Sequence, residues 1–90
     1  MENVNLINTK KNIRENVLKI LSRITRIDYS NISDDVFIRE ELGIDSLIAI
    51  EIIANIEMMY DIEIDENLIA DIEIVGDLIN LIDSIITNKR

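Results

Sequence analysis

The stretch ELGIDSL at residues 41–47, followed by a mostly apolar run, decides the predicted fold. Gly43 ends one segment, and an acid and a hydroxyl, Asp45 and Ser46, follow it where a long helix must begin. The first N–H groups of a helix have no partner within it, so Asp45 is placed to accept a hydrogen bond from them. These N–H groups also favour an anion on the Ser46 oxygen. We therefore predict a helix from Ser46 to about Tyr60.

The composition excludes every catalytic site that needs cysteine or histidine. The 90 residues include no cysteine and no histidine, which rules out thiolate nucleophiles, imidazole bases, zinc sites and Ser-His-Asp triads. Any covalent chemistry must come from a cofactor or a partner. The length allows one small domain, and the low aromatic content, 3%, predicts an aliphatic core.

No segment predicts a membrane protein. The uninterrupted apolar runs are a few residues long, far short of the roughly 20 residues that span a bilayer. Residues 1–8 lack the basic and then apolar layout of a signal peptide. We expect a cytoplasmic location.

The charge is unevenly distributed. Net charge is −9, yet residues 1–26 hold six basic residues and two acids, whereas residues 27–88 hold sixteen acids and the single cation Arg39. The acidic part should repel nucleic acid and anionic membranes and attract basic protein patches. We therefore expect protein partners with Lys or Arg at the docking surface.

Helical spacing of apolar residues predicts two further long helices and one short one. The first covers residues 9 to about 24, capped by Asn8 or Thr9, after a lead-in at residues 1–8. The last begins at Ile74 and ends near Thr87, followed by a basic tail at residues 89–90. Asp65 caps the short helix, Glu66 to about Asp71, and residues 61–65 form an extended link. The apolar positions of the first helix are Ile13, Val17, Ile20, Leu21 and Ile24, with Lys10, Lys11, Arg14 and Lys19 outside; those of the last are Val75, Leu78, Ile79, Ile82, Ile85 and Ile86.

Residues 27–45 have no sustained period and many turn formers, which predicts a long connection. A short helical turn is expected near residues 37–42. Apolar side chains should pin the connection to the core, namely Ile32, Val36, Phe37, Ile38 and Leu42.

The central helix, residues 46–60, has more apolar side chains than one buried stripe can hold. The spacing of Ile53, Ile56 and Tyr60 predicts the inner face. Flanking loops could cover the surplus near Ser46, but we expect part of it to stay exposed and to be covered by a docking partner. The surplus comprises Leu47, Ile48, Ile50 and Ile52, with Ala54 near an edge and Glu51, Asn55 and Met58 facing outward.

The Asp45-Ser46-Leu47 motif at a helix start resembles the attachment site of acyl carrier proteins. The match extends in order and spacing over much of the chain, through Ile32-Ser33-Asp34, the residues 42–47, Glu51, the residues 60–64 and Val75-Gly76-Asp77. The resemblance implies an all-α fold, a small four-helix bundle of the acyl-carrier type with three longer helices, one short helix and a long loop between the first two. It places the carrier domain at residues 9–88.

The resemblance also implies a function and a cofactor. In the family a serine carries 4'-phosphopantetheine, donated by coenzyme A, whose thiol holds acyl groups as thioesters; Ser46 matches that serine. Asp45 and Leu47 match the motif read by the phosphopantetheinyl transferase. Glu51 and Glu57 match acids that face basic patches of loading, elongating and off-loading enzymes, and Ile48 and Ile50 join this docking set. The resemblance further implies a carrier that is not itself an enzyme, and a monomer is expected.

Departures from the fatty-acid pattern leave the pathway open. Ile48 stands where fatty-acid carriers usually have an acid, and Met58 and Met59 replace two more. The residues 45–50 also resemble carrier domains of polyketide and nonribosomal peptide systems.

Two other classes of protein would explain part of the sequence. An acidic helical adaptor without a cofactor would explain the acidic surface but not the spacing from Gly43 to Leu47. A calcium loop beginning at Asp61 fails because its sixth position is Glu66, not glycine, and its twelfth is Ile72, not glutamate. No metal site is expected.

Overall fold

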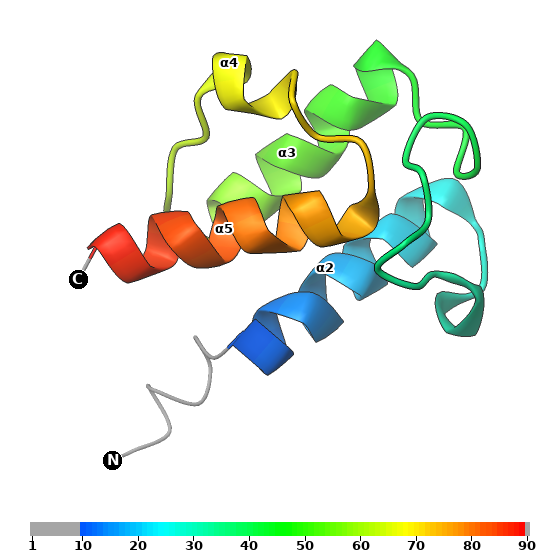
Figure 1. Ribbon diagram of the computed structural model, residues 1–90, viewed down its shortest axis with the longest axis horizontal. Helices are drawn as coiled ribbons and strands as arrows, with labels where there is room; N and C mark the ends of the chain where they lie inside the picture. The colour runs from blue at the N-terminus through cyan, green and yellow to red at the C-terminus, as the bar shows by residue number, and fades with distance from the viewer. Residues whose placement is uncertain (1–9, 90) are drawn as a thin grey trace.

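Helices account for the architecture. The computed structural model describes residues 10–89, except the side chain of Lys89. In chain order the elements are α2 (Lys10–Thr25), the short 3-10 helix η1 (Tyr29–Asn31), α3 (Ser46–Tyr60), α4 (Glu66–Ile69) and α5 (Val75–Lys89) (Figure 1). Three long helices, one short helix and the long connection between α2 and α3 confirm the predicted all-α bundle. The expected lead-in, the cap at Asn8 or Thr9, and Arg90 lie outside the described residues.

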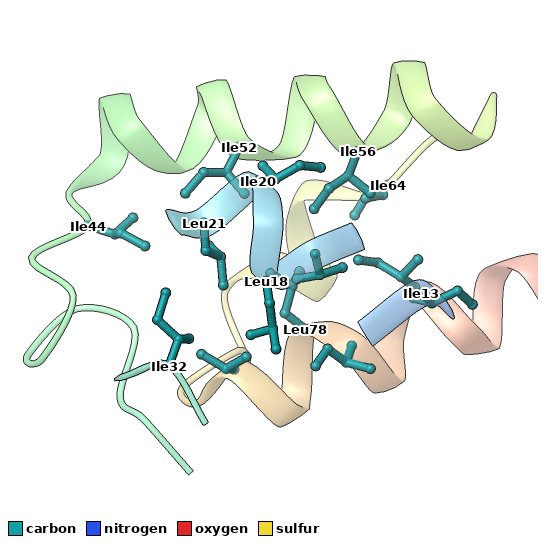
Figure 2. Close-up of a cluster of buried hydrophobic side chains, with 14 of the residues drawn as sticks. Ile13, Leu18, Ile20, Leu21, Ile32, Ile44, Ile52, Ile56, Ile64 and Leu78 are labelled. Carbon is teal, nitrogen blue, oxygen red and sulfur yellow. The ribbon is translucent and has the colours of Figure 1, made fainter. Parts of the chain in front are cut away.

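The core lies where α2 contacts both α3 and α5 (Figure 1). Aliphatic side chains of the three helices converge there, among them Leu18 and Leu21 from α2 and Ile56 from α3 (Figure 2). Each fully buried side chain of this size contributes about 1.5–3 kcal/mol by leaving water. The predicted stripe of α2 is confirmed, since Ile13, Val17, Ile20 and Leu21 are buried. Among residues 10–89, no helix is long and apolar enough to cross a membrane.

The long connection contacts both α2 and α5 through Asp34. Arg14, which lies outside the buried stripe of α2 as predicted, forms an ion pair through Nε with Oδ1 of Asp34 at 2.7 Å. The backbone of Asp34 also accepts a hydrogen bond from the Gly76 N–H at 2.8 Å. A Cβ at Gly76 would lie 3.3 Å from that carbonyl oxygen. Glycine at this position therefore lets the connection approach α5 closely.

Residues 36–38 run alongside the start of α5. The Ile38 N–H donates to the Glu73 carbonyl at 2.9 Å, and the Val75 N–H donates to the Val36 carbonyl at 3.0 Å. Alternation of side chains in this extended stretch turns Val36 and Ile38 toward the core and Phe37 away from it. The prediction that Phe37 pins the loop was therefore wrong, because its side chain is 46% exposed. Buried Ile32 and Leu42, with half-buried Val36 and Ile38, hold the connection instead.

The link between α3 and α5 follows the predicted pattern. Ile62 and Ile64 are buried in an extended stretch, and Asp65 caps α4 by accepting from the Asn67 N–H at 2.8 Å. Helix α4 ends at Ile69, earlier than predicted. Within residues 10–89 the only bridge of strand type is the isolated pair of Phe37 and Ile74.

The start of α5 depends on a carboxylate in its first turn. Oδ2 of Asp77 accepts from the N–H groups of Glu73 and Ile74 at 3.0 and 3.1 Å, and the bond from Glu73, followed by that from Ile74, lowers the pKa of Asp77 below its ordinary value of 3.8. The stabilisation is therefore present above about pH 3.8 and is lost as the pH falls through the folded-state pKa.

We expect Asp77→Ala to lower the free energy of unfolding by about 1 kcal/mol at pH 7, the usual cost of a lost cap. Urea titrations at pH 7 and at a series of lower pH values measure the difference from the parent protein. The difference should shrink as the pH falls below 3.8 and through the folded-state pKa of Asp77, which its hydrogen bonds to Glu73 and Ile74 lower. A difference that begins to shrink well above pH 3.8 would contradict the role of the carboxylate.

Candidate functional site

The start of α3 is built by the residues on either side of Gly43. Gly43 has φ +68°, a left-handed conformation that glycine adopts without strain, and its N–H donates to the Arg39 carbonyl at 3.1 Å. Oδ1 of Asp45 then accepts from the Ile48 N–H at 2.9 Å, which is the predicted cap. Ser46 is the first residue of the helix, and it is exposed. The hydroxyl therefore stands in solvent at the positive end of α3.

The outer face of α3 carries apolar side chains that the bundle leaves in solvent. Leu47 is 77% exposed and Ile50, three residues further along the same face near the Ser46 end, is 65% exposed, and Met58 is 83% exposed near the other end. Ile48 is half-buried, whereas Ile52 is buried. Exposure of part of this set agrees with the predicted surplus.

The inner face of α3 differs from the prediction. It is centred on Ile52 and Ile56, while Ile53 is only half-buried. Asn55, expected to face outward, is half-buried and accepts a hydrogen bond from Arg23 of α2 at 3.0 Å. Because nearly every position of this helix is apolar, its spacing alone does not select a face. Packing against α2 selects it.

The two predicted docking acids of α3 have different surroundings. Glu51 is exposed. Glu57 is half-buried, and its Oε2 accepts from the Ile64 N–H at 2.8 Å. The Glu57 carbonyl also accepts from the Ile62 N–H at 3.1 Å, so this residue fastens the link that follows α3. Glu57 thus has a structural use that the sequence pattern did not reveal.

We expect Glu57→Ala to lower the free energy of unfolding by about 1–3 kcal/mol, because it leaves a partly buried N–H without its acceptor. Glu57→Gln keeps an acceptor oxygen and should lose less. The matched control is Glu51→Ala on the exposed face of the same helix, which should stay within about 0.5 kcal/mol of the parent. Urea titration measures all three. Equal losses for Glu57→Ala and Glu51→Ala would contradict the fastening role.

An apolar cleft of about 420 Å³ opens beside Ser46. Residues of α3, α4, the long connection and the segment before α5 line it, with Leu21 and Leu78 from the other two helices at its base. Four of its lining residues are polar, namely Arg39, Asp45, Ser46 and Glu66, and all four are exposed. The aliphatic walls include Ile38, Ile44, Ala49, Ile53, Ile69 and Ile72.

The cleft has no counterpart among the sequence-based predictions. Its walls come from four segments that are distant in the chain, and only their packing brings them together. The surplus of isoleucine on the central helix was the available signal, and it predicted exposed surface without predicting a concave shape. The arrangement places an exposed hydroxyl at the edge of an apolar recess, which suits a group that is attached at one point and carries an apolar load.

The cluster of acids after α3 is spread over the surface. Asp61, Glu63, Asp65 and Glu66 are all exposed. Among the residues that the structure describes, no three acidic side chains gather closely enough to hold a metal ion.

Comparisons with known proteins agree with this geometry. Residues 15–82 match a protein family described as the phosphopantetheine attachment site. The acyl carrier protein of Shigella flexneri is 34% identical over 70 residues, which cover 78% of this chain and 90% of that protein. The acyl carrier protein of Shigella dysenteriae matches with the same identity and coverage. The chain therefore belongs to the acyl carrier protein family, whose attached cofactor is phosphopantetheine.

Proposed function

We propose that the chain carries acyl intermediates as thioesters on a 4'-phosphopantetheine arm attached to Ser46, and delivers them to separate enzymes. The observation that carries the proposal is the exposed Ser46 hydroxyl at the first residue of α3, on the edge of the apolar cleft. The chain performs no catalysis of its own. When attached, the arm supplies the thiol that holds the acyl group.

The residues around Ser46 suit a phosphodiester at that oxygen. The N–H groups of Ser46 and Leu47 precede the first hydrogen bond of α3, in which the Ala49 N–H donates to the Asp45 carbonyl at 2.8 Å. They leave the positive end of the helix dipole directed at an anion on Ser46. The Asp45 carboxylate accepts from the Ile48 N–H, so the helix cap uses Asp45 while the attachment would use the Ser46 hydroxyl.

The cleft supports an aliphatic acyl cargo. Ten of its fourteen lining residues are apolar, and each methylene that enters such surroundings gains about 0.8 kcal/mol relative to water. An aminoacyl group would bring a charged ammonium into walls without a buried polar partner, which is costly. This supports an aliphatic acyl chain from a fatty-acid or polyketide pathway over a nonribosomal peptide pathway.

Docking is proposed to use the outer face of α3 next to Ser46. Leu47 and Ile50 offer apolar contacts, and Asp45 and Glu51 offer charges to Lys or Arg of the partner. The partners are a phosphopantetheinyl transferase and enzymes that load, elongate and release the cargo. Docking should be weak, because a carrier must leave one enzyme to reach the next. A cytoplasmic monomer suits this movement between partner enzymes.

The test is transfer of the arm from coenzyme A. The chain is incubated with coenzyme A, magnesium and a transferase of broad specificity, and the intact mass is measured. A gain of one phosphopantetheine, mapped by proteolysis to the peptide that contains Ser46, is the expected result. An unchanged mass, with a known carrier loaded in parallel, would overturn the proposal and leave an adaptor without a cofactor.

A further inference from the structure

Arg39 is the one cation in the acidic part of the chain, and it lies at the cleft beside Ser46. Residues 27–88 carry sixteen acids and this single basic residue. Arg39 and Ser46 both line the apolar cleft. Neither the fold nor the docking surface described above uses the Arg39 side chain.

The backbone around Arg39 is held firmly in place. Its carbonyl accepts from the Gly43 N–H at 3.1 Å, and the preceding residue, Ile38, donates to the Glu73 carbonyl at 2.9 Å. The Ile38 carbonyl also accepts from the Ile44 N–H at 3.3 Å, two residues before Ser46. The turn that carries Arg39 is therefore fixed both to the entrance of α5 and to the segment that leads into α3.

The Arg39 side chain has no partner among the residues that the structure describes. Within residues 10–89 it forms no hydrogen bond and no ion pair, although acids surround it in the sequence. Two acids near the turn have other uses: Oε1 of Glu41 accepts from the Phe37 N–H at 2.7 Å, and Oδ1 of Asp45 accepts from the Ile48 N–H. Glu40 and Glu73 line a second, smaller cleft together with Arg39, and neither forms an ion pair with it. An exposed guanidinium without a partner, in a strongly acidic protein, is available to a further anion.

We propose that Arg39 binds the phosphodiester of the arm on Ser46 and so holds the first part of the arm over the mouth of the cleft. This inference rests on the proposed attachment at Ser46. A guanidinium pairs with phosphate oxygens through two parallel N–H groups, a geometry that lysine does not reproduce. Glu66, which also lines the cleft, repels the same phosphodiester, so Arg39 is the lining residue that attracts it.

The size of the effect follows from the exposure of the pair. An exposed ion pair changes the ratio between the paired and unpaired orientations of the arm by a factor of about two to five. Salt weakens this preference. Arg39 would therefore bias the direction of the arm without locking it, which leaves the arm able to swing to a partner enzyme. It is a positioning residue and has no part in bond making.

Phosphorus NMR of the loaded protein tests the inference, because the arm contains the single phosphorus atom. Four loaded proteins are compared: the parent, Arg39→Gln, Arg39→Lys and Lys11→Gln. Lys11→Gln removes the same charge from an exposed side chain in the first turn of α2. That end of α2 lies toward the end of α3 distant from Ser46, since Asn16 donates to the Tyr60 hydroxyl.

We expect Arg39→Gln to shift the phosphorus resonance at low salt and to change its relaxation toward that of a more mobile group. The difference from the parent should vanish near 1 M salt, where the screening length is about 3 Å. The phosphorus shift and relaxation of Arg39→Lys should lie between those of the parent and those of Arg39→Gln. Lys11→Gln should match the parent. Identical shift and relaxation for the parent and Arg39→Gln at low salt would overturn the role of Arg39. A parent protein that gains neither mass nor phosphorus signal would instead overturn the attachment itself, and with it this inference.

Discussion

Replacing Ser46 with alanine is expected to abolish transfer of phosphopantetheine and to leave the fold intact. The hydroxyl is exposed and the α3 cap comes from Asp45, so no described contact of the bundle depends on the Ser46 oxygen. Alanine is also the better helix former, which keeps the change in the free energy of unfolding within about 0.5 kcal/mol. Intact mass after incubation with coenzyme A and a transferase measures the loading.

Two other serines provide matched controls for this result. Ser33, in the long connection, and Ser84, on α5, are exposed as Ser46 is, but neither begins a helix. Ser33→Ala and Ser84→Ala should therefore gain one arm, as the parent does. A mass gain that persists in Ser46→Ala and disappears in either control would move the attachment to another residue.

The length of the cargo should change the stability of the loaded protein. If an aliphatic chain enters the cleft, each methylene contributes up to about 0.8 kcal/mol, so an octanoyl cargo should exceed an acetyl cargo by about 2–4 kcal/mol in the free energy of unfolding. For a domain of this size, 1 kcal/mol corresponds to roughly 4–8 °C in Tm. Thermal unfolding of the two acylated proteins measures the difference, and equal Tm values would contradict entry of the cargo into the cleft.

Substitutions at two alanines of α3 test whether the cleft causes the dependence of stability on cargo length. Ala49 lines the cleft and Ala54 is exposed on the same helix outside it. Ala49→Leu should fill part of the recess and reduce the difference between octanoyl and acetyl forms. Ala54→Leu adds the same side chain to the same helix and should leave that difference unchanged. A length dependence that survives Ala49→Leu in full would place the cargo elsewhere.

The sequence predicted the start of α3 well because the determinants are local. A glycine with positive φ and an acid that caps the next turn act within a few residues of each other, so their spacing is enough to place Ser46 at the first residue. The stripe of α2 was equally clear, since polar residues separate its apolar positions.

What the sequence could not predict depends on contacts between distant segments. The inner face of α3 was misplaced at Ile53 because a helix that is apolar almost all round has no preferred side until a neighbour packs against it. Phe37 was assigned to the core on hydrophobicity alone, whereas the pairing of residues 36–38 with the start of α5 decides which side chains turn inward. The structural bond of Glu57 joins residues seven apart, beyond the reach of helical spacing rules.

The pairing of residues 36–38 with residues 73–75 has a consequence for the capacity of the carrier. This pairing makes the wall of the cleft at Ile38 rigid, because main-chain hydrogen bonds of 2.9 and 3.0 Å hold residues 36–38 against the start of α5. Another part of the lining comes from α4, which is only four residues long and whose main-chain hydrogen bonds, within the described residues, stay within residues 65–72. A longer acyl chain would thus gain room by displacing α4 outward. The side chains under that small helix would then limit the length of acyl chain that the cleft can bury.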